Sequence, residues 1–308
     1  MKKVLIIIGI IILIPVVLII GLLVLMSFVP AVPKNYTKEV KTGGYIEAKY
    51  LAMGEYKVKN TKSKATELTK YNYVYYPEEL ESSNKKYPVV VVLNVTGVLP
   101  KKYKALFEHL ASWGFIVVGN DDGSTGFGKS ADETIDYIKK ANDDKDSVLY
   151  QKIDVDNIGI TGHSQGGAGV FTSISIMEHK DEYKTAVALS PTNEEAALAY
   201  GWNYDLTKIN IPTLVVAGTI GDFETQAVLP IEKMIEMYDK ITAPKIMMRR
   251  IDADHGQMLY RADGYVTAWF MWQLQGDEEA ARAFIGDSPE LMNNSMYQDQ
   301  RIDLGEQP

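Results

Sequence analysis

Short apolar runs alternate with helical patterns along most of this chain, and that alternation limits the possible folds more than any other feature. The run Pro88–Leu93 contains four consecutive valines and no polar side chain, which is typical of a strand covered on both faces. Further strands are expected at Phe115–Val118, Asn157–Thr161, Thr185–Leu189, Pro212–Ala217 and Lys245–Met248. Helical patterns lie between them, at 103–113, from Ser130 onward, and at about 166–178, 226–240 and 263–275.

Two local signals add detail to this pattern. Thr69–Tyr76 alternates aromatic and polar residues, as an edge or antiparallel strand does. Ser130 and Glu133 have the spacing of a capping box that opens a helix. Buried strands that alternate with helices predict an α/β fold with a mostly parallel central sheet flanked by helices. Ligands bind such sheets at the carboxyl ends of the strands, so the loops there should carry the chemistry.

The first thirty residues form a separate unit. Lys2 and Lys3 precede an uncharged apolar run from Val4 to Val29, and a helix needs only about 20 residues to cross a membrane. We therefore expect a transmembrane signal anchor at 1–30, a juxtamembrane spacer at 31–44 and one catalytic domain at 45–308. The two lysines favour a cytoplasmic N-terminus, which places the domain outside the cell membrane of a bacterium. A cleaved signal peptide, which would make the protein secreted, is the alternative.

Composition excludes several classes of function. The 308 residues include no cysteine, which rules out a disulfide framework, a thiolate nucleophile and a Cys-ligated zinc site. The formal net charge is −8, which argues against a protein that grips the phosphate backbone of nucleic acid.

The strongest motif is Gly162-His163-Ser164-Gln165-Gly166, which follows a predicted strand and precedes a predicted helix. A serine in this G-x-S-x-G pattern lies on a sharp turn that lifts its hydroxyl to the top of the sheet. The backbone N–H of Gln165 then faces the oxyanion that develops during acyl transfer. Ser164 is therefore the candidate nucleophile.

A serine nucleophile needs a base, and the chain has four histidines. His109 lies on a predicted helix, at its surface or at the edge of the core. His163 is next to the serine and is better placed to support the turn, and His179 lies near the far end of the following helix. His255 lies in the loop after the last predicted strand, at the correct end of the sheet. By elimination His255 is the expected base.

The base needs a carboxylate that orients it, and the second oxyanion donor should come from another loop. Asp222 follows the strand 212–217 and completes the chain order Ser, Asp, His of this fold. Glu224 is its nearest rival, and Asp252 and Asp254 are further candidates. The second oxyanion donor is expected in the loop Asn94–Leu99, at the N–H of Val98, with Thr96 as its rival.

A competing motif, Gly123–Ser130, satisfies the phosphate-loop pattern G-x-x-x-x-G-K-S. Asp121 and Asp122 enter this loop and would repel phosphates. Four residues also separate it from the preceding strand, whereas a phosphate loop normally leaves its strand directly. We therefore expect a glycine-rich loop beside the active site and no nucleotide binding.

These segments together resemble the α/β-hydrolase superfamily, and more closely its chlorophyllase, dienelactone hydrolase and polyester hydrolase (cutinase-like) branch. The resemblance covers about residues 45–300 and is carried by Tyr87–Leu93, Leu110–Val118, Gly162–Gly167, Asp254–Gly256 and Val266–Leu274. It implies cleavage of carboxylic esters by a serine triad of Ser164, Asp222 and His255, with Gln165 and Val98 as oxyanion donors and without metal or cofactor.

Two departures concern the substrate. Polyester hydrolases of this kind carry an aromatic residue in the oxyanion loop and a tryptophan after the strand that follows the elbow. Here those places hold Val98 and Thr192, which argues against a stacking clamp for aromatic polyesters. Trp202 and Tyr204 either line a cleft or belong to buried packing.

The sequence thus predicts a membrane-anchored, extracytoplasmic serine hydrolase of small or medium esters. Its partners would be the ester and, through the N-terminal helix, the membrane. Two alternatives remain open. One is a catalytically silent surface module that binds a ligand with the same fold. The other is a hydrolase of a different acyl bond, in a peptide, lactone or thioester.

Overall fold

The computed structural model describes residues 29–65 and 68–305. Its strands form one sheet in the order β1-β2-β4-β3-β5-β6-β7-β8-β9. Their bounds are β1 Val58–Lys64, β2 Tyr71–Pro77, β3 Tyr87–Leu93, β4 Ile116–Asn120, β5 Ile153–His163, β6 Thr185–Leu189, β7 Thr213–Gly218, β8 Lys245–Arg250 and β9 Tyr297–Asp303. The strands from β4 to β8 along this order run parallel, and β1, β2 and β9 add antiparallel pairs at the two ends.

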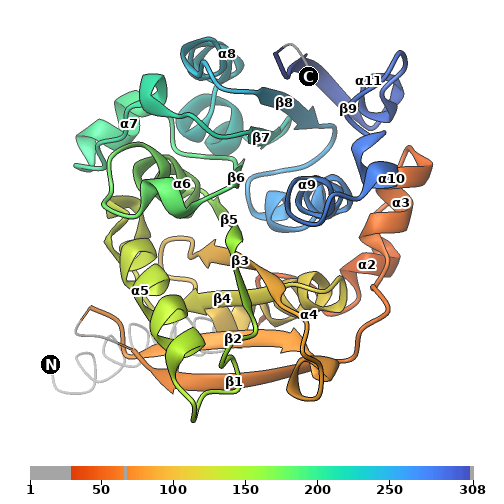
Figure 1. The fold of residues 1–308 in the computed structure, drawn as a ribbon. Coiled ribbons are helices and arrows are strands. Elements are labelled where there is room, and N and C mark those ends of the chain that lie inside the picture. Colours follow the sequence, from red (N-terminus) through yellow and green to blue (C-terminus); the bar gives the residue numbers. More distant parts are fainter. Residues whose placement is uncertain (1–28, 66–67, 306–308) are drawn as a thin grey trace, which may run out of the picture.

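Helices cover both faces of the sheet (Figure 1). The longer ones are α4 Lys104–Ser112, α5 Lys129–Asp143, α6 Gln165–Ser175, α8 Ile231–Lys240 and α9 Asp263–Gln275. The short ones are α2 Tyr36–Glu39, α3 Tyr45–Leu51, α7 Glu194–Ala199, α10 Glu278–Ala281 and α11 Glu290–Asn293. Single turns lie at Glu78–Glu81, Pro100–Lys102, Thr125–Phe127, Lys180–Glu182, Leu206–Lys208, Phe223–Val228 and Gly256–Leu259.

The sheet separates two apolar cores, one on each face. Phe107 of α4 and Trp269 of α9 belong to the first core. Ile135 of α5, Phe171 of α6 and Met234 of α8 belong to the second. All seven residues of β3 are buried, because this central strand is covered from both sides. The α/β fold with a mostly parallel sheet is therefore confirmed.

The predicted strands and longer helices are all present, and two edge strands were missed. β2 is antiparallel, as Thr69–Tyr76 indicated, but it is not an edge, because β1 covers it. The sequence of β1 is Val-Lys-Asn-Thr-Lys-Ser-Lys, and β9 is also polar. Such strands do not show the alternation of a half-buried strand, because only one neighbour and little core hold them in place.

The capping box predicted at Ser130 is wrong. α5 begins one residue earlier, and its N-cap is Gly128 in the left-handed conformation (φ 74°). Ser130 is buried inside the first turn, where its carbonyl accepts a hydrogen bond from Asn120 Nδ2 at 3.1 Å. A glycine that tolerates positive φ, and not a serine side chain, sets the start of this helix.

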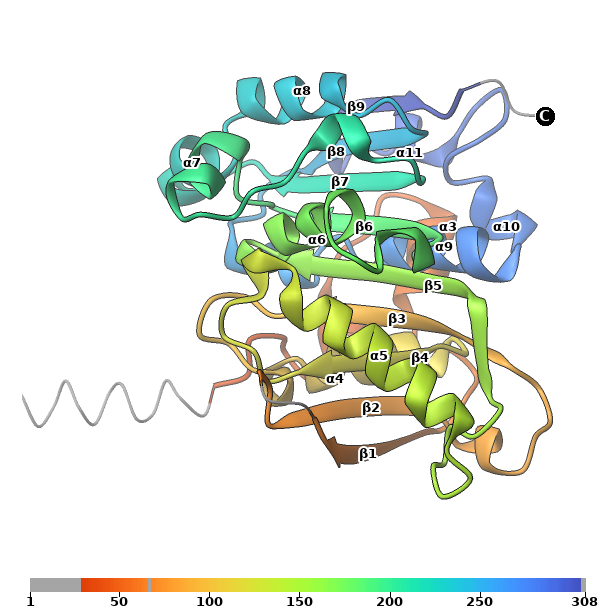
Figure 2. The ribbon, with the colours of Figure 1, turned by 60° about the vertical axis from the view of Figure 1, so that its left-hand side comes forward.

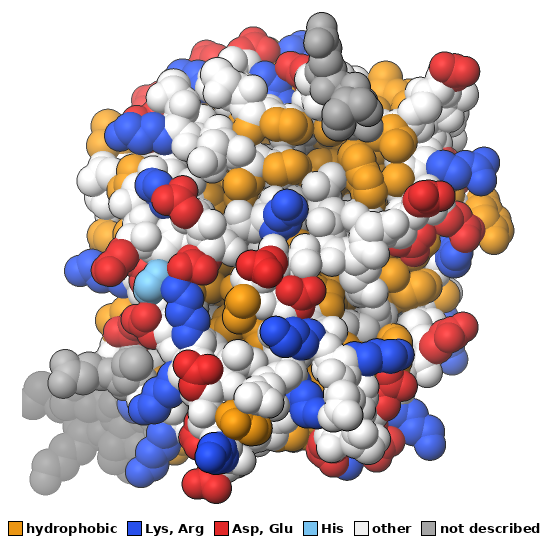
Figure 3. Space-filling view, in the orientation of Figure 1, with side chains coloured by type: hydrophobic (Ala, Val, Ile, Leu, Met, Phe, Trp, Pro, Cys, Tyr) orange, Lys and Arg blue, Asp and Glu red, His pale blue; other side chains and the backbone are white. Residues whose placement is uncertain are grey.

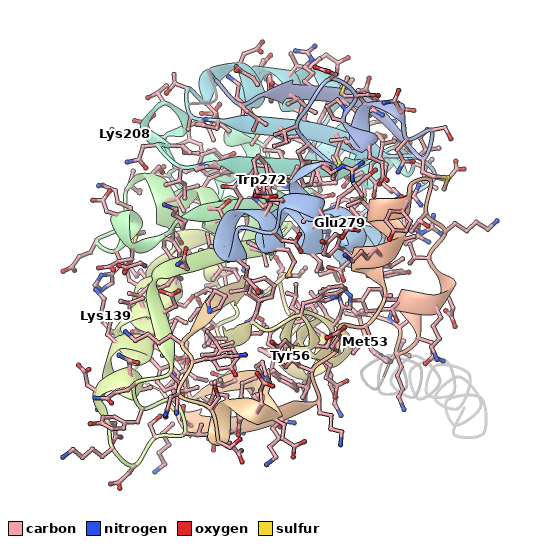
Figure 4. The ribbon with its side chains drawn as sticks, turned by 45° about the vertical axis from the view of Figure 1, so that its right-hand side comes forward. Met53, Tyr56, Lys139, Lys208, Trp272 and Glu279 are labelled. Carbon is pink, nitrogen blue, oxygen red and sulfur yellow. The ribbon has the colours of Figure 1, made fainter. Side chains whose placement is uncertain are left out.

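The N-terminal segment packs onto the domain. Val32 and Tyr36 are buried in the first core, so residues 31–44, expected as a spacer, form part of the folded unit. Further along, Lys49 of α3 pairs with Glu279 of α10 at 2.6 Å. Figure 4 labels Glu279 beside the ribbon of α3, and Trp272 on α9.

Most of the expected transmembrane anchor, residues 1–28 of 1–30, lies outside the described residues. Across residues 29–65 and 68–305, no helix combines the length and apolar character needed to cross a bilayer.

Candidate active site

The turn between β5 and α6 holds Ser164 in a strained conformation. Its φ is 59° and its ψ is −118°, values that a residue with a side chain rarely adopts. The glycines of the motif make this turn possible. A Cβ on Gly162 would lie 2.4 Å from the carbonyl oxygen of Gly166, and one on Gly166 would lie 2.6 Å from that of Leu93. This is the sharp strand-to-helix turn predicted from the sequence.

His255 lies beside this turn, and the carboxylate of another residue contacts its Nδ1. Its Nδ1 is 2.6 Å from Oε2 of Glu224. Its ring centroid is 4.4 Å from that of His163, the residue immediately before Ser164. The imidazole therefore lies between a buried carboxylate and the serine turn.

The carboxylate that contacts His255 is Glu224, the rival named above, and not Asp222. Asp222 is exposed, and its Oδ1 accepts a hydrogen bond from Gln226 Nε2 at 2.9 Å. The cause is the geometry of the turn after β7. Gly218 at the end of that strand donates its N–H to Glu224 at 2.6 Å, so the residues between them, including Asp222, loop outward.

Glu224 is fully buried and accepts several hydrogen bonds. Ser190 Oγ donates to its Oε1 at 2.6 Å, in addition to the bonds from Gly218 and His255. Burial alone would raise the pKa of Glu224, but the hydrogen bonds from these three donors outweigh it and lower the pKa below its usual value. Glu224 is therefore a fixed negative charge against the imidazole. Nothing in the sequence marks Ser190, although it follows a predicted strand at the same end of the sheet.

His163 supports the loop that carries His255. Its Nε2 donates to the carbonyl oxygen of His255 at 2.7 Å. Burial holds the pKa of His163 well below its usual value, and the nearby charge on His255 lowers it further. His163 is thus a neutral donor, in agreement with the supporting role that the sequence suggested.

The backbone amide of Gln165 lies at the start of α6, where an N–H has no carbonyl within the helix to bond. Its side chain donates to the carbonyl oxygen of Gly123 at 3.0 Å, which ties the turn to the neighbouring loop.

The N–H of Val98, the other expected oxyanion donor, is already bonded to the carbonyl oxygen of Val95 at 3.0 Å. The N–H of Val95 donates in turn to Tyr103 Oη at 2.9 Å. No described group accepts a hydrogen bond from the N–H of Thr96, the rival donor, whose residue is exposed.

The phosphate-loop motif forms part of the rim of the site. Gly128 donates its N–H to Thr125, and Ser124 donates its N–H to Asp122 Oδ1, so these amides are bonded within the loop. Thr125 Oγ1 donates to the carbonyl oxygen of Asn94 at 2.7 Å and joins this loop to the oxyanion loop. This geometry gives no support to phosphate binding by the loop, and it agrees with a loop that borders the candidate site.

The other histidines lie away from the turn. His109 is fully buried, which excludes the surface position among the two that the sequence left open, and its Nδ1 lies 2.7 Å from Oδ2 of Asp263. His179 is paired with Asp136 at 3.0 Å. Across the described ranges, no group of three or more His, Asp or Glu side chains is placed to hold a metal ion.

Thr192, Trp202 and Tyr204, whose places in the sequence bear on the substrate, lie near the serine turn or the glycine-rich loop. Thr192 donates its N–H to the carbonyl oxygen of Ser164 at 3.3 Å and accepts a bond from Tyr204 Oη at 2.9 Å. Trp202 packs on the glycine-rich loop, where a Cβ on Gly126 would lie 2.5 Å from its ring. Tyr204 and Trp202 therefore border the serine turn and the rim loop.

Known proteins resemble this chain at low identity. It is 24% identical to "Cutinase est2" of Thermobifida alba, over 56% of this chain and 51% of that protein. It is 24% identical to "Cutinase 2" of Thermobifida cellulosilytica, over 48% of this chain and 51% of that protein. It is also 24% identical to "Cutinase cut1" of Thermobifida fusca, over 48% of this chain and 42% of that protein. The chain spans about half the length of the curated relatives it matches.

The family comparison covers more of the chain. The sequence model of the family described as PET hydrolase-like matches residues 42–300, a range that contains the serine turn, Glu224 and His255. The resemblance expected from the sequence is thereby confirmed, and the chain belongs to the PET hydrolase-like family, in the polyester hydrolase branch of the α/β-hydrolases.

Proposed function

We propose that this protein is a serine hydrolase of carboxylic esters, with a triad of Ser164, His255 and Glu224. The observation that carries the proposal is the position of His255, whose ring lies beside the serine turn while its Nδ1 contacts a buried carboxylate at 2.6 Å. Glu224 replaces Asp222 of the sequence-based hypothesis, because Asp222 is turned away from the imidazole.

The reaction follows from these positions. Ser164 Oγ attacks the acyl carbon while His255 Nε2 takes its proton, and Glu224 stabilises the imidazolium that forms. The carbon–oxygen bond to the alcohol then breaks, and His255 returns the proton to the leaving alcohol. Water, deprotonated by the same imidazole, attacks the acyl-enzyme and releases the carboxylic acid and free Ser164. A peptide, lactone or thioester could be cleaved by the same groups.

Two backbone amides would stabilise the oxyanion, each in a place where it has no competing acceptor. The first is the N–H of Gln165 at the start of α6. For the second we replace Val98 by Thr96, because the N–H of Val98 is engaged within its own turn. Both loops meet near the serine turn, since Gly166 packs against the backbone of Leu93.

The location proposed is the outer face of a bacterial cell membrane. Its support is the apolar run from Val4 to Val29 behind Lys2 and Lys3, which suits a signal anchor at 1–30. The substrates proposed are small or medium esters, because only a short stretch, about 191–211, separates β6 from β7 and provides no large lid.

Replacement of Ser164 by Ala tests the proposal. We expect turnover of p-nitrophenyl butyrate to fall by roughly 10⁶-fold, since no other group supplies the nucleophile. Ser124→Ala, at an exposed serine of the neighbouring loop, is the matched control and should keep the wild-type rate. A fluorophosphonate probe should label Ser164 in the wild type and the control. A wild-type rate in Ser164→Ala would refute the assignment, and no labelling of the wild type would favour a silent binding module.

A further inference from the structure

The described chain enters the domain at the same edge of the sheet as the candidate active site. Ala31 and Val32 donate their N–H groups to the carbonyl oxygen of Lys102, in the segment that leaves the carboxyl end of β3. Ser164 lies at the carboxyl end of β5, which runs parallel to β3. Figure 2 shows the first described residues on the same side of the molecule as α7, which leaves the carboxyl end of β6.

Buried side chains fix the chain to the domain at this entry point. Val32 and Tyr36 are each 1% exposed, and Tyr36 Oη donates to Asp263 at 2.5 Å. Val29, three residues before Val32, is 59% exposed and ends the apolar run of the sequence. Val29 is only three positions from the buried Val32, so a binding partner of the preceding residues would lie close to this edge.

Exposed apolar side chains collect at the same edge. Of the twelve large apolar side chains exposed in the described part of the chain, seven lie at the chain entry or in segments that leave a strand at this edge. They are Val29, Leu68, Phe127, Leu198, Tyr200, Ile220 and Phe223. We call these seven residues the apolar rim. Figure 3 shows another face of the molecule, over which charged side chains of both signs are widely spread and apolar patches lie between them.

The apolar rim flanks the candidate site on two sides. The ring of Phe223, which is 62% exposed, stands perpendicular to that of His255 with centroids 4.9 Å apart. On the other side, the ring of Tyr200 is tilted by 31° against that of Trp202, with centroids 4.8 Å apart, and Trp202 packs on the loop that Gln165 also contacts. Apolar side chains thus lie on two sides of the place where an ester would enter.

We propose that the apolar rim docks on a lipid bilayer, so that the candidate active site faces the membrane surface. The occupant is argued from the chain itself. A run of 26 uncharged and mostly apolar residues, long enough to span a bilayer, ends at Val29 within the rim. Exposed Lys34 and Lys101 lie beside this entry and suit anionic lipid headgroups. An ester carried in the bilayer then reaches Ser164 without passing through bulk water. This consequence rests on the proposed ester hydrolysis, whereas the docking rests on the proposed signal anchor and not on the triad.

The experiment uses the full chain, purified and reconstituted in vesicles of phosphatidylcholine and phosphatidylglycerol. The chain has no cysteine, so single cysteines can be introduced and labelled with an environment-sensitive fluorophore. Leu198→Cys reports on the rim. Val155→Cys is the matched control, an exposed aliphatic residue near the start of β5, at the opposite edge of the sheet. A nitroxide carried on the lipid headgroup quenches a fluorophore that lies at the membrane surface.

We expect quenching about threefold or more stronger at position 198 than at 155, because docked side chains enter the headgroup region. Equal quenching at the two positions, or a full chain that does not float with the vesicles, overturns the proposal. Shielding of position 198 that occurs in detergent and grows with protein concentration would identify a second copy of the chain as the occupant, and also overturns it. Fluorophosphonate labelling of Ser164 in the same samples reports separately on the proposed function.

Discussion

Two histidine–carboxylate pairs in this molecule have nearly the same nitrogen–oxygen distance and entirely different surroundings. His255 Nδ1 is 2.6 Å from Glu224, and His109 Nδ1 is 2.7 Å from Asp263. The contact of His255 has the geometry of a hydrogen bond, whereas that of His109 is a close ion-pair contact without it. The pairs differ further at the other ring nitrogen. His109 Nε2 donates to the carbonyl oxygen of Ala52 at 2.9 Å, whereas no described group bonds the Nε2 of His255.

The surroundings of each pair decide what it can do. The pair of His109 is closed on all sides: its two side chains are 0% and 2% exposed, and Tyr36 Oη takes a further position on the carboxylate. It joins the N-terminal segment, α4 and the start of α9, so it is a structural tie. The pair of His255 lies at the carboxyl edge of the sheet beside a strained serine. A histidine–carboxylate contact is therefore not evidence of catalysis until the second nitrogen is free to meet a nucleophile.

The strongest test of the difference between the two pairs is to remove the charge of Glu224. Glu224→Gln keeps the size of the side chain but cannot stabilise an imidazolium, so we expect kcat for p-nitrophenyl butyrate to fall by about 10⁴-fold. Asp222→Asn is the matched control. It should stay within about twofold of the wild type, because its exposed side chain contacts Gln226 and not the imidazole. A large loss in Asp222→Asn with a small loss in Glu224→Gln would return the role to Asp222.

The corresponding change in the other pair should affect folding and not chemistry. Asp263→Asn removes one partner of a buried pair, and such a loss costs about 3–5 kcal/mol of the free energy of unfolding. Urea denaturation measures this cost. The kcat per folded, fluorophosphonate-reactive molecule should match the wild type. Tyr36→Phe, which removes one neutral donor to the same carboxylate, should cost only about 1–2 kcal/mol. A kcat loss in Asp263→Asn comparable to that of Glu224→Gln would mean that the two pairs are not distinct in function.

The fold was predictable from the sequence wherever burial leaves a pattern. The central strand β3 is buried at all seven positions, so its residues had to be apolar and the run was visible. The edge strand β9 alternates buried or half-buried and exposed residues, but only Tyr297 and Ile302 are apolar among its inward positions, so its sequence shows too little of a pattern to mark a strand. The tight turn at Ser164 was equally visible, because only glycine fits where Gly162 and Gly166 approach other backbone atoms.

The carboxylate that contacts His255 was not predictable, because two acidic residues two positions apart differ only in how one turn folds. Asp222 fits the residue type expected at this position, and the turn after β7 nevertheless brings Glu224 back to Gly218. The expectation that the N–H of Val98 is an oxyanion donor meets a related difficulty, because that N–H is bonded to the carbonyl oxygen of Val95. The hydrogen bond between Val98 and Val95 is a property of the loop conformation, which the string Asn-Val-Thr-Gly-Val does not reveal.

A third histidine sharpens the comparison with the smallest expected effect. His163 has no carboxylate partner; its Nδ1 is buried without a polar partner among the described residues, and its pKa is held well below the usual value, chiefly by burial. Between its lowered pKa in the folded state and about 6.5 in the unfolded state, only the unfolded chain binds the proton. Its contribution to stability is thus fully present above about pH 6.5 and is lost as pH falls, by up to about 1.4 kcal/mol per pH unit.

His163→Gln tests this sign. The amide Nε2 of glutamine can still donate to the carbonyl oxygen of His255 but does not titrate. Between pH 7.5 and 5.5, the free energy of unfolding from urea denaturation should fall by about 1 kcal/mol more in the wild type than in the variant. All other titrating groups are shared, so they cancel in the difference. Equal losses in the two proteins would mean that His163 takes up its proton in the folded state as readily as in the unfolded chain, and that burial beside His255 does not keep it neutral.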